Sequence, residues 1–333
     1  MRRPRSLERS YSRRNQVRLR IRSFLLSASL TGIVAASSAG VGISEQHEMQ
    51  GPLTPRVRPA EGRQPPVNLR LDVQVILVPV TVTDALERPM TTLPRESFRV
   101  LEDGVEQKIT SFSQEEGPVS LGLLFDSSGS MKNRIGTSLA ALENLFRTII
   151  PGDEFFLVRF SDQAELLTGF TDTPGEVYGK LGLVQPQGWT AMLDAIAMGA
   201  HKMKSARNPR KALLILSDGE DNNSRFSEAE IKNMVVEADL RVYAIGIFHR
   251  PRFLQQLAEE TGGRVLIAQN LKDLPNIVKR LSAEIRSHYL LGFVSSNSQK
   301  DGKYRRLKVE VAQPEGSPAP RASWRRGYYA PND

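Results

Sequence analysis

Cysteine is absent from the 333-residue sequence. Disulfide bridges, thiolate zinc sites, a cysteine nucleophile and a lipid-modified cysteine are therefore excluded. Histidine is also scarce: only four are present, and none stands in the H-E-x-x-H spacing of a zinc enzyme.

Several other catalytic motifs are missing as well. The sequence contains no G-x-x-x-x-G-K phosphate loop, no G-x-G-x-x-G dinucleotide loop and no G-x-S-x-G nucleophile elbow. A metal-dependent phosphoryl-transfer enzyme with an aspartyl nucleophile is an alternative, because Asp126 ends a predicted strand. Such sites carry a second Asp two positions later, where this chain has Ser128. We therefore predict that the protein is not an enzyme.

Net charge is absent from most of the chain, although the whole sequence carries +8. Residues 1–39 hold nine arginines and one glutamate, which accounts for the full excess of +8. The remaining residues, 40–333, hold 36 basic and 36 acidic side chains. This balance argues against a nucleic-acid-binding function, since such proteins need a basic surface.

The first 39 residues have the pattern of a secretory signal. An arginine-rich segment precedes the apolar stretch 24–36, and small residues follow up to Ala39. We predict a signal peptide at 1–39 and therefore an exported, periplasmic or extracellular protein. An uncleaved segment that anchors the chain to a membrane is the alternative, and only in that case would the membrane be a partner.

Residues 40–67 predict a disordered, proline-rich linker, because they hold five prolines and little that could form a core. The next segment, 68–116, alternates apolar and polar residues as β-strands do, with a hairpin signal at Asp103-Gly104 and a return strand over 107–112. A second β segment covers 289–333. Because each segment is too short to form a stable β domain alone, we predict one small β-sandwich built from both.

Strands and helices alternate between these two segments, over 117–288. Apolar runs predict buried strands, and helical periodicity predicts helices between them. The predicted strands are 119–125, 155–160, 164–167, 212–216, 242–248 and 265–268, and the predicted helices are 135–150, 190–203, 227–238, 253–260 and 271–288. This alternation predicts an α/β fold with a doubly wound, mostly parallel, Rossmann-like sheet.

Oxygen-bearing side chains follow the predicted strands at the edge where such sheets bind ligands. Asp126, Ser128 and Ser130 follow the first strand of the α/β unit, Thr190 precedes a helix, and Asp218 follows the strand 212–216. Hard oxygen donors without imidazole or thiolate suit Mg²⁺, Mn²⁺ or Ca²⁺. Each residue alone could instead cap a helix or form a turn. The set of five together favours a metal site.

The pattern Asp126-x-Ser128-x-Ser130 with Thr190 and Asp218 resembles the metal-ion-dependent adhesion site of von Willebrand factor type A (VWA) domains. The order of elements over 117–288 resembles that family too. Three further phrases resemble a bacterial exported subfamily described as VWFA-related: V-x-V-x-D at 80–84, F-x-V-x-E-D-G at 98–104 and R-G-Y at 326–328.

The resemblance implies a role for each residue. Ser128, Ser130 and Thr190 would bind the cation through their hydroxyls, and Asp126 and Asp218 would hold its water ligands. An open position on the cation would take an acidic side chain of a protein partner. The resemblance therefore implies an adhesion or assembly module. A structural scaffold without a metal-dependent ligand is the alternative.

Three further residues stand next to the five predicted metal-site residues and are candidates for contact with the partner. We call them the recognition rim. Trp189 stands next to Thr190, and Glu220 and Asp221 follow Asp218. A large aromatic side chain at the rim can anchor a partner, although packing against a neighbouring helix is an equally good interpretation. The acidic residues are typical of a solvated turn and alternatively tune a second cation site.

Overall fold

The computed structural model describes residues 74–313 and 319–332. The predicted signal peptide (1–39), the predicted linker (40–67) and the beginning of the predicted first strand lie outside the described residues. Leu69–Asp333 form one of the two units of the chain, and every element described below belongs to it.

A six-stranded sheet forms the middle of this unit, in the order β10-β9-β8-β5-β6-β7. Its strands are β5 (Val119–Asp126), β6 (Glu154–Phe160), β7 (Ala164–Thr171), β8 (Arg210–Ser217), β9 (Arg241–Ile247) and β10 (Val265–Ala268). All neighbours pair in parallel except β7, which runs antiparallel to β6 at one edge. Every residue of β5 is buried, as expected for a central strand covered on both faces.

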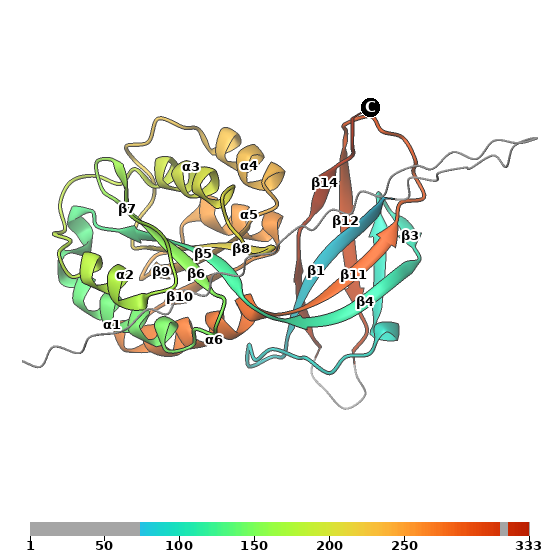
Figure 1. Cartoon of the computed structure of the whole chain (residues 1–333), viewed down its shortest axis with the longest axis horizontal. Helices are drawn as coiled ribbons and strands as arrows, with labels where there is room; N and C mark the ends of the chain where they lie inside the picture. The colour runs from blue at the N-terminus through green and yellow to red at the C-terminus, as the bar shows by residue number, and fades with distance from the viewer. Residues whose placement is uncertain (1–73, 314–318, 333) are drawn as a thin grey trace, which may run out of the picture. The chain divides into compact units, whose positions relative to one another are not determined.

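Helices cover both faces of this sheet (Figure 1). They are α1 (Ile135–Phe146), α2 (Pro174–Leu181), α3 (Met192–Met203), α4 (Glu228–Glu237), α5 (Arg252–Thr261) and α6 (Leu274–Arg286). One apolar core packs α1, α2 and α6 against the sheet, and the other packs α3, α4 and α5 against the opposite face. The predicted doubly wound α/β fold is confirmed.

Two helix ends follow local sequence rules. Ser227 accepts a hydrogen bond from the backbone N–H of Glu230, whose side chain in turn accepts one from the backbone of Ser227, which is the capping box that begins α4. Gly262 ends α5 with a φ of +77°. A β-carbon at Gly262 would lie 2.6 Å from the backbone of Trp324 and Arg325, so both the conformation and the space require glycine.

A β-sandwich is built from the two flanking segments. Its sheets have the strand orders β13-β1-β11-β4 and β14-β12-β2-β3. The N-terminal strands are β1 (Val75–Thr83), β2 (Phe98–Glu102), β3 (Val105–Gln107) and β4 (Ile109–Glu116), and the C-terminal strands are β11 (Ser287–Val294), β12 (Tyr304–Val311), β13 (Arg321–Trp324) and β14 (Gly327–Tyr329). Because β11 pairs with both β1 and β4, and β12 pairs with β2, the prediction of one shared sandwich is confirmed.

Three of the differences between the predicted and the observed elements are larger than a shift of a boundary. The expected strand over 107–112 is two strands, because the side chain of Gln107 hydrogen-bonds Ser296 and the chain passes from one sheet to the other at Lys108. The helix expected over 271–288 is shorter: the 3₁₀ turn η3 (Leu271–Asp273) precedes α6, and His288 lies buried in β11. Finally, α2 was not predicted from the sequence.

Candidate metal centre

The carboxyl ends of the parallel strands meet at one edge of the six-stranded sheet, and this edge carries the polar residues predicted from the sequence. Asp126 is the last residue of β5, and Asp218 directly follows β8. Because β5 and β8 are neighbours, the two carboxylates reach the same edge. The 3₁₀ turn η2 (Gly129–Asn133) begins next to Ser128 and brings Ser130 to this edge.

Four of the five predicted residues form one hydrogen-bonded chain. The hydroxyls of Ser128 and Ser130 lie 3.1 Å apart, and the Ser130 hydroxyl donates to Oδ1 of Asp218 at 2.6 Å. At the other end, Oδ1 of Asp126 accepts from the backbone N–H of Ser128 at 2.8 Å. The second oxygen of Asp126 accepts from the Ser217 hydroxyl at 2.5 Å.

The fifth residue, Thr190, lies buried in the loop before α3. Its backbone N–H donates to Oδ1 of Asn222 at 2.8 Å, which ties this loop to the one that follows β8. Among the residues that the structure describes, no hydrogen bond joins the Thr190 hydroxyl to the other four side chains. The helix expected to begin at 190 begins at Met192, so Thr190 stays in the loop.

The loop that carries Thr190 is fixed to η2 and to the end of β6 through Gly188. The carbonyl of Gly188 accepts from the backbone N–H of Gly129 at 3.0 Å, and Asp162 accepts from the backbone N–H of Trp189 at 2.7 Å. Gly188 has a φ of +77°, and a β-carbon there would lie 2.3 Å from the Asp162 carboxylate. This close approach excludes any other residue without rearrangement.

Asp126 is a carboxylate in an unusual environment. Its side chain is fully buried, and its hydrogen-bond donors are neutral hydroxyl and backbone groups. Burial raises the pKa of Asp126 above its ordinary value, the hydrogen bonds from Ser128 and Ser217 lower it, and the nearby charge of Asp218 raises it. A cation at this edge would offset the cost of holding the two buried carboxylates together.

Sequence reasoning missed Arg134, which follows η2. Its guanidinium donates to Oδ2 of Asp218, whose side chain is fully buried, and it also lies 5.1 Å from the ring centre of Phe248. Phe248 directly follows β9 and has a φ of +61°, which is rare for a bulky residue. Neither contact could be predicted from spacing, because each depends on how loops far apart in the sequence meet.

The three predicted rim residues have different surroundings. Trp189 is 64% exposed, as a recognition residue must be. Glu220 is exposed and hydrogen-bonds His249 and the backbone N–H of Arg252. Asp221 instead turns inward, because its carboxylate accepts from the backbone N–H of Leu193 at the start of α3 and from the hydroxyl of Ser224.

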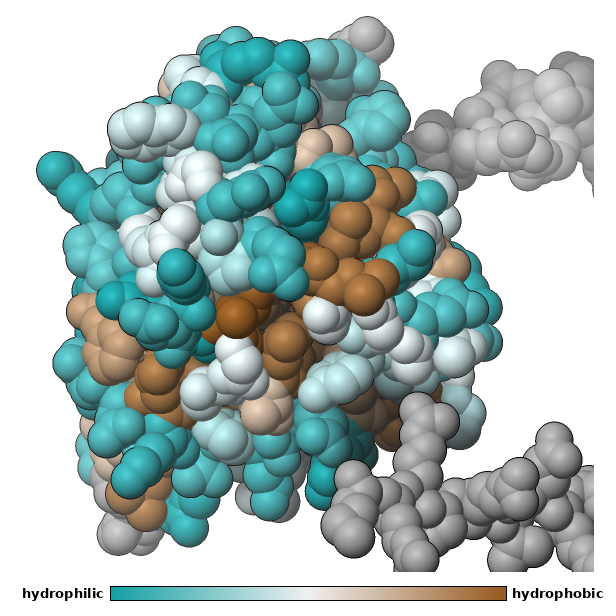
Figure 2. All heavy atoms as spheres, turned by 90° about the vertical axis from the view of Figure 1, so that its left-hand side faces the viewer, coloured by the Kyte–Doolittle hydropathy of each residue, from teal (hydrophilic) through white to brown (hydrophobic). Residues whose placement is uncertain are grey.

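Apolar side chains are exposed around the same edge. Figure 2 views the molecule from the side on which β5 ends, and brown apolar surface crosses the middle of this face. Leu183 is 76% exposed and Phe248 is 47% exposed, in addition to Trp189. Exposed apolar surface beside a polar site is typical of a protein-binding surface.

The donor set fits a hard divalent cation. All the ligand atoms that these side chains offer are oxygens, two of the side chains are buried carboxylates, and the Ser130 hydroxyl already points toward Asp218. Within the described part of the chain, no group of three or more His, Asp or Glu side chains could hold a metal ion.

Comparison with protein families identifies the domain that carries this edge. A family model described as von Willebrand factor type A domain matches residues 121–220. This segment contains all five predicted residues, most of β5 and the whole of β6, β7 and β8. The chain contains a VWA domain. A search of curated proteins gave no match.

Solved structures similar to the VWA domain and its surroundings come from animals and bacteria. Proximal thread matrix protein 1 from the mussel byssus is 18% identical, with a TM-score of 0.44, over 54% of this chain and 49% of its own. The chain thus spans about half the length of that protein. The mussel protein has also been solved with a zinc-occupied MIDAS (metal-ion-dependent adhesion site) motif.

Two bacterial structures are also similar to this chain. A von Willebrand factor type A protein from Catenulispora acidiphila is 14% identical, with a TM-score of 0.47, over 78% of this chain and 74% of its own. An aerotolerance-related membrane protein from Bacteroides fragilis is 18% identical, with a TM-score of 0.43, over 50% of this chain and 98% of its own.

Of the helices in the described residues, none is both long enough and apolar enough to cross a bilayer.

Proposed function

We propose that the protein is an exported adhesion or assembly module that binds a protein partner through a divalent cation at the VWA domain. One observation carries this proposal: the hydroxyls of Ser128 and Ser130 and the carboxylates of Asp126 and Asp218 lie in one hydrogen-bonded chain at the carboxyl edge of the sheet. Helix capping alone would not require these oxygens to converge.

The hydroxyl and carboxylate side chains would have different roles at the cation. Ser128, Ser130 and Thr190 would hold the cation through neutral oxygens, and Asp126 and Asp218 would offset its charge from behind. Because the hydroxyls are neutral, a bound Mg²⁺, Mn²⁺ or Ca²⁺ would keep most of its charge and attract an acidic side chain of the partner. Mg²⁺ suits such a site well, since it keeps exchangeable water ligands.

The surface around the cation would select the partner. Trp189, Leu183 and Phe248 offer exposed apolar contact area, and Glu220 adds a charge on the same edge. A partner with an acidic residue flanked by apolar side chains fits this surface. We propose binding rather than catalysis, since the sequence holds no phosphate loop, dinucleotide loop or nucleophile elbow.

A scaffold function without a bound cation is the second candidate, and the Arg134–Asp218 ion pair favours it. The guanidinium already offsets the charge of the Asp218 carboxylate. In that case Arg134 and the hydrogen bonds among the serines and aspartates would hold the edge together without a cation. The two candidates differ in whether the protein takes up a divalent cation.

Calorimetric titration of Mg²⁺ and Mn²⁺ into the protein separates them. We expect saturable binding at one site for the unaltered chain and no binding for Asp126→Ala, because the alanine removes a buried carboxylate from the edge. Glu143→Ala is the matched control, since this exposed carboxylate lies on α1 and pairs with Arg147. Binding retained by Asp126→Ala, or absent from the unaltered protein, would contradict the proposal.

A further inference from the structure

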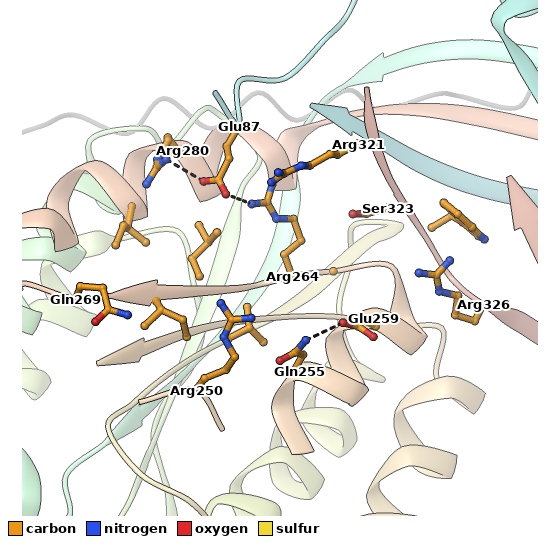
Figure 3. A pocket seen from close by; sticks show the side chains of 16 residues that line it. Glu87, Arg250, Gln255, Glu259, Arg264, Gln269, Arg280, Arg321, Ser323 and Arg326 are labelled. Carbon is orange, nitrogen blue, oxygen red and sulfur yellow. Dashed lines mark hydrogen bonds and ion pairs between the residues drawn. The ribbon is translucent and has the colours of Figure 1, made fainter. Parts of the chain in front are cut away.

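A second surface of the VWA domain lies along β10, the edge strand of the six-stranded sheet. A groove of about 560 Å³ runs along its outer side. The groove is bordered by α5, α6 and the segment around β13, and Figure 3 shows it from close by. It shares no lining residue with the predicted metal site.

Arginine dominates the polar lining of this groove. Five arginines reach it from separate parts of the chain, against two glutamates, Glu87 and Glu259. The arginines are Arg250, Arg264, Arg280, Arg321 and Arg326. The groove therefore has an excess of positive charge, although residues 40–333 as a whole have none.

Glu87 shows how a carboxylate is held in this groove. One of its oxygens lies 2.9 Å from Arg264, and the other lies 2.9 Å from Arg280 (Figure 3). Arg264 also pairs with the buried Glu284 at 3.1 Å. These two arginines are thus already engaged with acidic side chains of the chain itself.

The other three arginines are not engaged in this way. In residues 74–313 and 319–332, no carboxylate lies within ion-pair distance of Arg250, Arg321 or Arg326. The guanidinium of Arg326 stacks over the ring of Trp324 at 4.3 Å, which fixes its plane. Arg250 follows β9, whereas Arg321 and Arg326 come from the segment around β13, so the groove offers positive charge from more than one side.

The backbone of β10 supplies a second kind of binding group. Arg264 and Ala268 accept hydrogen bonds from Ala244 and Phe248 on the β9 side. Because alternate residues of a strand direct their N–H and C=O groups to opposite sides, Val265 and Ile267 direct theirs to the outer edge. Both of these residues line the groove.

We propose that this groove binds an acidic segment of a partner protein in an extended conformation, which pairs with β10 as an added strand. Backbone hydrogen bonds to Val265 and Ile267 hold the segment, and its carboxylates reach Arg250, Arg321 and Arg326. The four residues of β10 span about 13 Å at ~3.3 Å per residue, so a segment of four to six residues is long enough.

The open strand edge favours a peptide over a nucleic acid. Phosphates would also attract the arginines, but they make no use of the paired N–H and C=O groups of an edge strand. Charged side chains beside a short edge strand also protect it from aggregation, and a merely protective role predicts no specific binding of an acidic peptide.

The test is fluorescence anisotropy of the full chain with a labelled peptide of alternating Glu and Val, in buffer with EDTA so that the metal site makes no contribution. We expect saturable binding that Arg250→Glu/Arg321→Glu weakens at least about tenfold. Arg147→Glu, a charge reversal directly after α1 and outside the groove, is the matched control and should bind as the unaltered protein does.

A second peptide tests the strand addition itself. N-methylation of alternate residues keeps the charge but removes the backbone donors, and it should weaken binding about as much as the double substitution. Equal binding of the methylated peptide, equal loss in the Arg147→Glu control, or tighter binding of a single-stranded oligonucleotide of equal charge would each overturn the proposal. Because EDTA is present throughout, failure here leaves the metal-dependent function untouched.

Discussion

The VWA domain and the β-sandwich are built in opposite ways. The six strands of the domain follow one another within residues 119–268, whereas each sheet of the sandwich takes strands from both ends of the described chain. Parallel strands send their carboxyl ends to one edge, and the residues that follow them converge there. Antiparallel strands send successive turns to opposite ends, so their polar residues are dispersed. The polar residues predicted to form a site therefore lie together in the domain and not in the sandwich.

Removal of residues 289–333 should have the largest effect and should separate the two regions. β11 lies between β1 and β4, and β12 pairs with β2, so the N-terminal strands lose their partners. We expect loss of hydrogen-exchange protection over residues 75–116, while β5 and β8 keep theirs. Unchanged protection over 75–116 would mean that the N-terminal strands fold independently.

His288 lies where the VWA domain meets the β-sandwich, and it should make the stability of the protein depend on pH. Burial, together with the charges of Arg241 and Arg210, lowers the pKa of His288 from 6.5 to about 3. The unfolded chain takes up this proton near pH 6.5, but the folded chain does so only near pH 3. Stability from this residue is therefore full above pH 6.5 and is lost as the pH falls toward 3, by at most ~1.4 kcal/mol per pH unit.

Denaturant unfolding at several pH values checks this expectation. His288→Gln should unfold with a smaller loss of stability between pH 6.5 and pH 4 than the unaltered protein. His201→Gln on the exposed surface of α3 serves as the control and should keep the original slope. A slope in His288→Gln identical to that of the unaltered protein would contradict the assignment.

A smaller loss of stability is expected from a substitution at Tyr289 in the core of the sandwich. The Tyr289 hydroxyl accepts from the backbone N–H of Leu93 at 2.8 Å and donates to the carbonyl of Met90 at 2.9 Å. Tyr289→Phe leaves both backbone groups without this partner and should lower the free energy of unfolding by about 1–3 kcal/mol. Chemical denaturation monitored by tryptophan fluorescence measures the change, and a difference below about 0.5 kcal/mol would show that water replaces the hydroxyl.

The smallest expected change concerns affinity at the carboxyl edge of the domain. Arg134 pairs with Asp218, so its positive charge opposes a second cation there. Arg134→Ala should tighten Mn²⁺ binding about tenfold in calorimetry. Arg147→Ala, which removes an arginine from the exposed end of α1, should change nothing. Weaker binding in Arg134→Ala would mean that this arginine positions the site instead of competing with the cation.

Much of the fold could be predicted because its signals are local. Buried parallel strands are continuous apolar runs, the Ser227–Glu230 pair begins α4, and Gly262 ends α5. The helix α2 escaped prediction because it is short and contains Pro174, Gly175 and Gly179, which are typical of loops. The strand expected over 107–112 divides because of a contact between Gln107 and Ser296, 189 residues apart.

The candidate site also contains residues that could be predicted from the sequence and residues that could not. Asp126, Ser128, Ser130 and Asp218 could be placed together because each stands within five residues of the end of a predicted strand. Arg134 and Phe248 could not, since their contacts depend on the approach of loops more than 80 residues apart in the sequence. The inward turn of Asp221 also depends on a distant partner, the backbone of Leu193.

A crystal of the protein soaked in Mn²⁺ and measured near the manganese absorption edge would show directly whether the VWA domain binds a divalent cation. We expect an anomalous peak beside the hydroxyls of Ser128 and Ser130, with the guanidinium of Arg134 displaced from Asp218. No peak at this edge, with Arg134 still paired to Asp218, would contradict the metal-dependent function and would leave the VWA domain as a scaffold.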